Sequence, residues 1–65
     1  MSDGQMWMVI RTDETGNSYL VRDELGESDA NMLVGRFSGH KQSYWAIPYG
    51  PGGREQTLQA NHVIV

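Results

Sequence analysis

The fold of this chain is decided by the stretch Gln42-Ser43-Tyr44-Trp45-Ala46-Ile47-Pro48-Tyr49, which holds three of the six aromatic residues. As a strand, it points Trp45, Ile47 and Tyr49 to one face and Tyr44, Ala46 and Pro48 to the other. Both faces are apolar, whereas a strand that is half covered alternates apolar with polar side chains. A chain of 65 residues is too small to cover both faces from within unless its sheet closes into a barrel. We therefore expect either a partly closed barrel or a face that another molecule covers.

The length and composition predict one small folded domain. Residues 1–65 make a single domain, in which we expect residues 1–4 to be disordered. A hydrophobic content of 38% with 20% charged residues is typical of a folded domain and not of a disordered tail. A core of this size contributes only about 3 to 5 kcal/mol, and a chain without cysteine has no disulfide or thiolate metal site to add to it. Oligomerisation is the remaining support, so we expect a homo-oligomer.

The sequence predicts a cytoplasmic protein without membrane contact. No apolar run approaches the roughly 20 residues that span a bilayer. The first four residues have neither the basic nor the apolar region of a signal peptide. The absence of cysteine suits a reducing compartment.

Charge is distributed unevenly along the chain, whose net charge is -3. Residues 1–32 carry seven acidic side chains against two arginines, whereas residues 33–65 carry three cations against Glu55 alone. If the two halves present separate surfaces, head-to-tail contact between copies follows. If the halves fold together, the charges intermingle and favour no such contact.

The first half of the sequence predicts a hairpin followed by a helix. Strands are expected over residues 5–12 and 18–23, joined by a loop in which Gly16 or Asn17 takes a positive φ. Ser28 is the expected N-cap of a helix that ends near Ser38 and faces the sheet with Leu33 and Phe37. Gly35 inside this helix marks either a close approach to a strand or a tolerated weak point.

The second half predicts two further strands. The third covers residues 42–49, with Pro48 at its end or on a sheet edge because proline cannot donate to a ladder. Residues 54–65 form a fourth extended segment, and its aliphatic end, Val63-Ile64-Val65, should pair with another strand. The predicted fold is α+β, a small antiparallel four-stranded sheet or partly closed barrel with one short helix, in the order strand, strand, helix, strand, strand.

No constellation of residues predicts catalysis, metal binding or a cofactor. His40 and His62 stand at no recognised spacing from a serine or from a set of metal ligands. The pairs Asp13-Glu14 and Asp23-Glu24 lie in or beside loops, where solvated charge is the ordinary explanation. The glycine-rich stretch 50–54 lacks the Lys-Ser/Thr of a phosphate loop. We predict a protein that is not an enzyme and has no cofactor.

Several short motifs together resemble a class of short, uncharacterised proteins of high-GC bacteria and their phages. They cover residues 6–65 and comprise a strand with Trp7, Gly-Asn-x-Tyr-Leu-Val from Gly16, a helix with Asp29-Ala30, Trp45-Ala46-Ile47-Pro48, and Leu-Gln-Ala-Asn-His-Val-Ile-Val from Leu58. The resemblance implies a compact accessory protein and carries over no catalytic residues.

We expect a non-enzymatic protein-interaction module that self-associates or docks on a larger partner, in the manner of a phage accessory or regulatory protein. The predicted contact residues are Trp7, Tyr44, Trp45 and Tyr49, with Arg36 and Arg54 at the rim. The alternative is a small β domain that binds single-stranded nucleic acid through Tyr44, Trp45, Tyr49, Lys41 and Arg54. A net charge of -3 disfavours this alternative, because phosphate binding recruits several cations.

Overall fold

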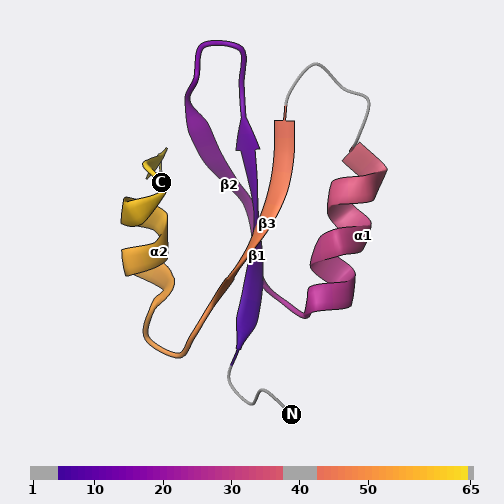
Figure 1. Cartoon of the computed structure of the whole chain (residues 1–65), viewed down its shortest axis with the longest axis vertical. Helices are drawn as coiled ribbons and strands as arrows, with labels where there is room; N and C mark the ends of the chain where they lie inside the picture. Colours follow the sequence, from indigo (N-terminus) through magenta and orange to yellow (C-terminus); the bar gives the residue numbers. More distant parts are fainter. Residues whose placement is uncertain (1–4, 38–42, 65) are drawn as a thin grey trace.

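The computed structural model describes residues 5–37 and 43–64, which form four strands and two helices (Figure 1). Along the chain these are β1 (Met6–Thr12), β2 (Ser18–Leu25), α1 (Glu27–Phe37), β3 (Ser43–Tyr49), α2 (Arg54–Ala60) and β4 (Val63–Ile64). The protein is α+β as predicted, but it has two helices where one was expected. The expectation of disorder at residues 1–4 and the predicted helix end near Ser38 lie outside the described residues.

The four strands form one sheet in the order β3-β1-β2-β4. β1 is antiparallel to both of its neighbours, but β2 and β4 are parallel, so the sheet is mixed and not wholly antiparallel. The sheet curls into a half-barrel, and its outer strands β3 and β4 do not pair with each other. Val63 and Ile64 pair with Ser18 and Tyr19, which confirms that this aliphatic end joins a strand.

The loop between β1 and β2 is ordered by one carboxylate. Asp13 Oδ1 accepts hydrogen bonds from the Thr15 hydroxyl at 2.7 Å and from the N–H groups of Thr15 and Asn17, both at 3.0 Å. The Thr15 hydroxyl is the largest cause that lowers the pKa of Asp13, followed by the N–H of Asn17. Gly16 adopts a φ of +90°, as the turn prediction required of this residue or its neighbour.

Each face of the sheet is covered by a helix. α1 contacts β1 and β3 on one face, where Val9 and Ala30 are fully buried (Figure 1). On the other face, α2 and β4 complete a core of Met8, Ile10, Tyr49, Leu58 and Val63. The half-barrel agrees with the expected partly closed barrel, but the cover that α2 gives to the second face was not foreseen, because residues 54–60 were counted as a strand.

Residues 54–60 form the helix α2 and not the predicted extended segment. The Gly53 carbonyl accepts hydrogen bonds from the Thr57 N–H at 3.0 Å and from the Thr57 hydroxyl at 2.8 Å, which fixes the first turn. Leu58 is 3% exposed and joins the core. After the helix, His62 takes a φ of +56° and its N–H donates to the Gln59 carbonyl. Glycine usually occupies this position, so the sequence lacks the common signal of a helix end.

The start of α1 differs by a residue or two from the prediction. The Gly26 carbonyl accepts the Ala30 N–H at 2.9 Å, and the helix begins at Glu27, so Ser28 lies inside its first turn and is not the N-cap. A Cβ atom at Gly35 would meet no heavy atom within 4 Å. Gly35 therefore makes no close approach to a strand and is a weak point of the helix.

Candidate functional site

The two outer strands of the sheet leave very different edges. β3 is seven residues long and pairs with β1 without interruption, from Met6 opposite Tyr49 to Thr12 opposite Ser43. Among the described residues, no strand pairs with its other side. None of the seven side chains is charged. We call this outer side of Ser43–Tyr49 the β3 edge.

The hairpin identifies which backbone groups point toward the β3 edge. Asp13 directly follows β1, and its N–H donates across the hairpin to the Asn17 carbonyl at 2.9 Å. Because the direction of the backbone groups alternates along a strand, the odd-numbered residues of β1 also direct theirs toward β2. The even-numbered residues of β1 then direct theirs toward β3. Their partners in the register are Tyr49, Ile47, Trp45 and Ser43.

In the remaining residues of β3, the backbone N–H and carbonyl groups point away from β1. Because the direction alternates along a strand, the polar groups of Tyr44, Ala46 and Pro48 point away from β1. Pro48 has no N–H. Because the backbone of residue 48 points away from β1, the proline removes no hydrogen bond between β3 and β1. The β3 edge therefore offers two N–H donors, from Tyr44 and Ala46, and carbonyl acceptors from all three residues.

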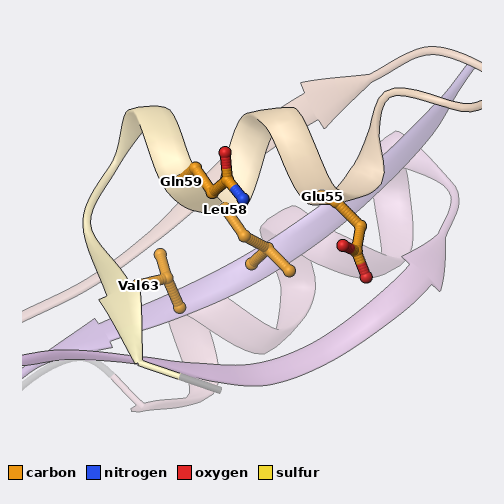
Figure 2. A pocket seen from close by; sticks show the side chains of 4 residues that line it. All are labelled: Glu55, Leu58, Gln59 and Val63. Atoms are coloured by element: carbon orange, nitrogen blue, oxygen red, sulfur yellow. The ribbon is translucent and has the colours of Figure 1, made fainter.

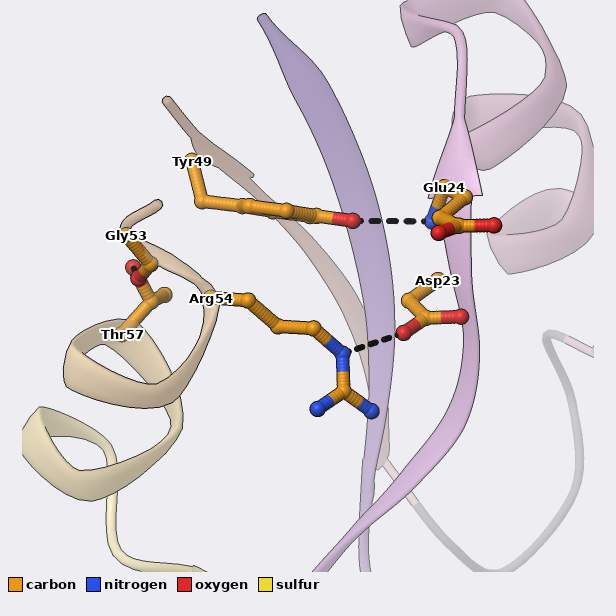
Figure 3. Close-up of polar contacts among 6 residues, drawn as sticks. All are labelled: Asp23, Glu24, Tyr49, Gly53, Arg54 and Thr57. Carbon is orange, nitrogen blue, oxygen red and sulfur yellow. Dashed lines mark hydrogen bonds and ion pairs between the residues drawn. The ribbon is translucent and has the colours of Figure 1, made fainter. Parts of the chain in front are cut away.

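The opposite edge of the sheet is protected. β4 pairs only with the first two residues of β2, and the rest of β2 carries charged side chains and two irregularities in its register with β1. Glu24 takes a φ of +57°, and its N–H donates to the Tyr49 hydroxyl at 3.0 Å (Figure 3). Bulges and charges of this kind prevent strand addition in natural proteins. The β3 edge has neither, and its one feature of this protective kind is Pro48.

An ion pair fixes α2 beside the protected edge. Arg54 Nε donates to Asp23 Oδ2 at 2.5 Å, with the two side chains 40% and 27% exposed (Figure 3). The hydrogen bond to Asp23 is the main cause that raises the pKa of the Arg54 guanidinium. This arginine therefore supports the fold at β2 and does not flank the β3 edge.

On the face covered by α1, a row of half-buried rings runs from the helix across the sheet. Phe37 stacks on Tyr44 with ring centroids 4.8 Å apart, and Tyr44 lies opposite Arg11 in the register of β1 and β3. The Arg11 guanidinium carbon lies 4.8 Å from the centroid of the Tyr19 ring. The row joins α1, β3, β1 and β2, so it braces the sheet from its free edge inward.

On the face covered by α2, two half-buried apolar side chains stand at the β3 edge. Trp45 and Ile47 pack against the core, and both keep part of their surface exposed. The Trp45 indole N–H donates to Thr12 Oγ1 at 3.2 Å, and this oxygen is 3.0 Å from Ser18 Oγ. The ring is therefore held in a fixed orientation beside the free edge.

The structure separates the six residues predicted to contact a partner. Tyr44 and Trp45 lie on β3, and Trp7 is half-buried on β1 opposite Pro48. Tyr49 is 8% exposed and belongs to the core, Arg36 is exposed in the last turn of α1, and Arg54 forms the ion pair with Asp23. Sequence reasoning missed the outward donors of Tyr44 and Ala46. The one signal for them was Pro48, whose missing N–H indicates which residues of β3 face away from a partner strand.

The residues of the nucleic-acid alternative do not form one surface. Tyr44 lies on the face covered by α1, whereas Trp45 and Tyr49 lie on the face covered by α2. The ring of Tyr49 is buried, Arg54 binds Asp23, and Lys41 lies outside the described residues. Stacking of successive bases requires rings on one exposed face.

Other features of the described residues offer less for binding. A shallow depression of about 70 Å³ beside α2 is lined by Glu55, Leu58, Gln59 and Val63 (Figure 2). This volume is far below the several hundred Å³ of a typical ligand site. Within residues 5–37 and 43–64, no three metal-ligating side chains come together. His62 forms part of the end of α2, and His40 lies outside the described residues.

Comparison with protein families, with curated proteins and with solved structures finds no match to this chain. In the part of the chain that the structure describes, neither helix has the length and apolar character needed to cross a membrane.

Proposed function

We propose that this chain is a non-enzymatic protein-interaction module that binds an extended protein segment along the β3 edge. In this mode the segment pairs with the outward backbone groups of Tyr44, Ala46 and Pro48 and so adds a strand to the sheet. The half-buried rings on the two faces of β3 lie beside the added strand. Main-chain bonds would supply affinity, and the side chains beside them would supply specificity.

The observation that carries this proposal is the contrast between the two edges of one small sheet. β2 combines charges, an irregular register and a left-handed residue, all of which discourage strand addition. β3 is regular, uncharged and seven residues long. An exposed edge of this kind is a liability unless something binds it, which favours a partner strand as its purpose.

We propose an accessory or regulatory role of the phage type, in line with the short motifs that gave the resemblance. A cytoplasmic location fits a chain without cysteine. The bound segment belongs either to another protein or to a second copy of this chain.

Affinity capture with matched baits tests the proposed function. The baits are the wild-type chain, Ala46→Pro, which removes an outward N–H from the β3 edge, and Gln59→Ala, an exposed control on α2. We expect proteins, including a differently tagged copy of the chain, on the wild-type and control baits and their loss from Ala46→Pro. Equal recovery on all three baits, or recovery of nucleic acid in place of protein, would contradict the proposal.

A further inference from the structure

We infer that the segment bound by β3 is β3 of a second copy, in an antiparallel pair whose twofold axis passes beside Ala46. This inference rests on the proposed function and names its partner. The pair would join two four-stranded sheets into one continuous sheet with β3 and its copy at the centre. Two features of β3 and the position of α1 favour a second copy over an unrelated segment.

The first feature is the pattern of outward hydrogen-bonding groups. With Ala46 opposite Ala46 of the second copy, each alanine N–H donates to the other alanine carbonyl. Tyr44 then lies opposite Pro48 of the second copy, and its N–H donates to the proline carbonyl. Every outward N–H of the β3 edge is paired, whereas the Tyr44 carbonyl of each copy receives no bond, because Pro48 of the other copy has no N–H. This register leaves no donor of the edge unpaired.

The second feature is the match of side chains across the axis. On the face covered by α2, Trp45 lies opposite Ile47 of the second copy, and both are now only half-buried. On the other face, the Tyr44 ring lies opposite the exposed Pro48. An aromatic side chain faces an aliphatic one in the pairs 44/48 and 45/47, and two small alanines meet at the axis. No charge is repeated across the pair, because β3 has none.

The third feature is the position of α1. This helix lies over β1 and β3, so two copies of it would run antiparallel on the same face of the joined sheet (Figure 1). An α1 axis midway between the two strands that it contacts, with strands about 4.8 Å apart, puts the two helix axes about 10 Å apart, which is the usual distance between packed helices. At this spacing the two copies of α1 would pack side by side without overlap.

Sedimentation and cysteine crosslinking of the full chain test the inference. We expect a monomer to dimer equilibrium that stops at the dimer, because a twofold pair is closed. The chain has no cysteine, so Ala46→Cys introduces a single thiol on the axis. Paired residues lie about 5.5 Å apart between Cα atoms, within reach of a disulfide. Mild oxidation should crosslink Ala46→Cys as a dimer and leave the exposed control Gln56→Cys monomeric.

Two further variants test the register and the bonds. Tyr44→Cys and Pro48→Cys should crosslink when mixed, and neither should do so alone. Ala46→Pro removes both central bonds and should weaken dimerisation about ten- to a hundredfold. Circular dichroism checks that Ala46→Pro is folded; if it is not, the crosslinking pattern decides.

The outcomes separate this inference from the proposed function. A chain that stays monomeric to about 1 mM, where even weak association with Kd in the millimolar range is visible, overturns the second copy. If the chain is monomeric but the Ala46→Pro bait still recovers fewer proteins than the wild-type bait, the β3 edge binds another protein and not a second copy. A dimer that forms without crosslinking through Ala46→Cys overturns the inference, and growth beyond the dimer indicates the head-to-tail contact instead.

Discussion

The Tyr49 hydroxyl accepts a hydrogen bond from the backbone N–H of Glu24 at 3.0 Å, across 25 positions of sequence. Glu24 is in the left-handed region at the irregular end of β2, where its N–H has left the regular ladder with β1. Tyr49 ends β3 and is buried in the core. One side chain therefore ties the two strands that flank β1 and satisfies a donor that the irregularity of β2 would otherwise leave unpaired (Figure 3).

Tyr49→Phe should lower the free energy of unfolding by about 1 kcal/mol, because the ring stays in the core and only the bond to Glu24 is lost. Tyr44→Phe is the matched control. Its ring stacks on Phe37, and in the described part of the chain its hydroxyl has no hydrogen bond, so we expect a change within about 0.5 kcal/mol. Urea denaturation of both variants measures the difference. Equal losses in the two variants would contradict a specific role for the Tyr49 hydroxyl.

Gly35→Ala should stabilise the protein by about 0.5 to 1 kcal/mol. The site is exposed in the middle of α1 and has room for a Cβ atom, so alanine restricts the unfolded chain at no steric cost to the helix. Gly16→Ala is the control, since a Cβ atom is equally unobstructed there but the φ is +90°. It should destabilise by about 1 to 2 kcal/mol. Thermal unfolding distinguishes the two, and a loss of stability in Gly35→Ala would contradict this account.

Stability should fall in acid as Asp13 becomes protonated. Hydrogen bonds from Thr15 and Asn17 lower the pKa of Asp13 in the folded protein below the value of 3.8 that the unfolded chain has. The stabilisation is therefore complete above pH 3.8 and is lost as the pH falls through the lower, folded pKa. Free energies of unfolding between pH 2 and 6 should show a shallower acid loss in Thr15→Ala, which lacks the hydroxyl bond. An unchanged slope would mean that other carboxylates cause the acid loss.

The hairpin, the edge position of β3 and the pairing of the aliphatic end were predicted, whereas α2 and the N-cap of α1 were not. Gly16 marked the hairpin, and Pro48 correctly marked β3 as an edge strand. α2 was missed because Leu58 is its only large apolar side chain, which fits a strand as well as a helix, and its burial under the sheet decides between them. The β3 edge could be identified only from the strand order, because the outward direction of the donors follows from the register of β3 with β1.

His62→Gly should raise the free energy of unfolding by up to about 1 kcal/mol. The residue follows α2 with a φ of +56°, which costs an L side chain energy that glycine avoids. Gln59→Gly, exposed inside the same helix, should instead lower it by about 1 kcal/mol. Guanidinium denaturation of both variants checks the pair. A loss of stability in His62→Gly would indicate that the imidazole has a role beyond its backbone position.

The outward direction of the Ala46 backbone predicts unequal effects of proline on β3. Ala46→Pro removes an N–H that points away from β1, so it should change stability by less than about 1 kcal/mol relative to the wild type. Ile47→Pro removes an N–H that points to β1 and should cost at least about 1 to 3 kcal/mol more than Ile47→Ala, which corrects for the lost side chain. Urea denaturation of the three variants at low concentration, where the chain is monomeric, gives both differences. The loss of stability in Ala46→Pro relative to the wild type should be smaller than the loss in Ile47→Pro relative to Ile47→Ala. Equal losses would mean that the Ala46 N–H points toward β1, and the β3 edge could then not bind a strand in the register proposed.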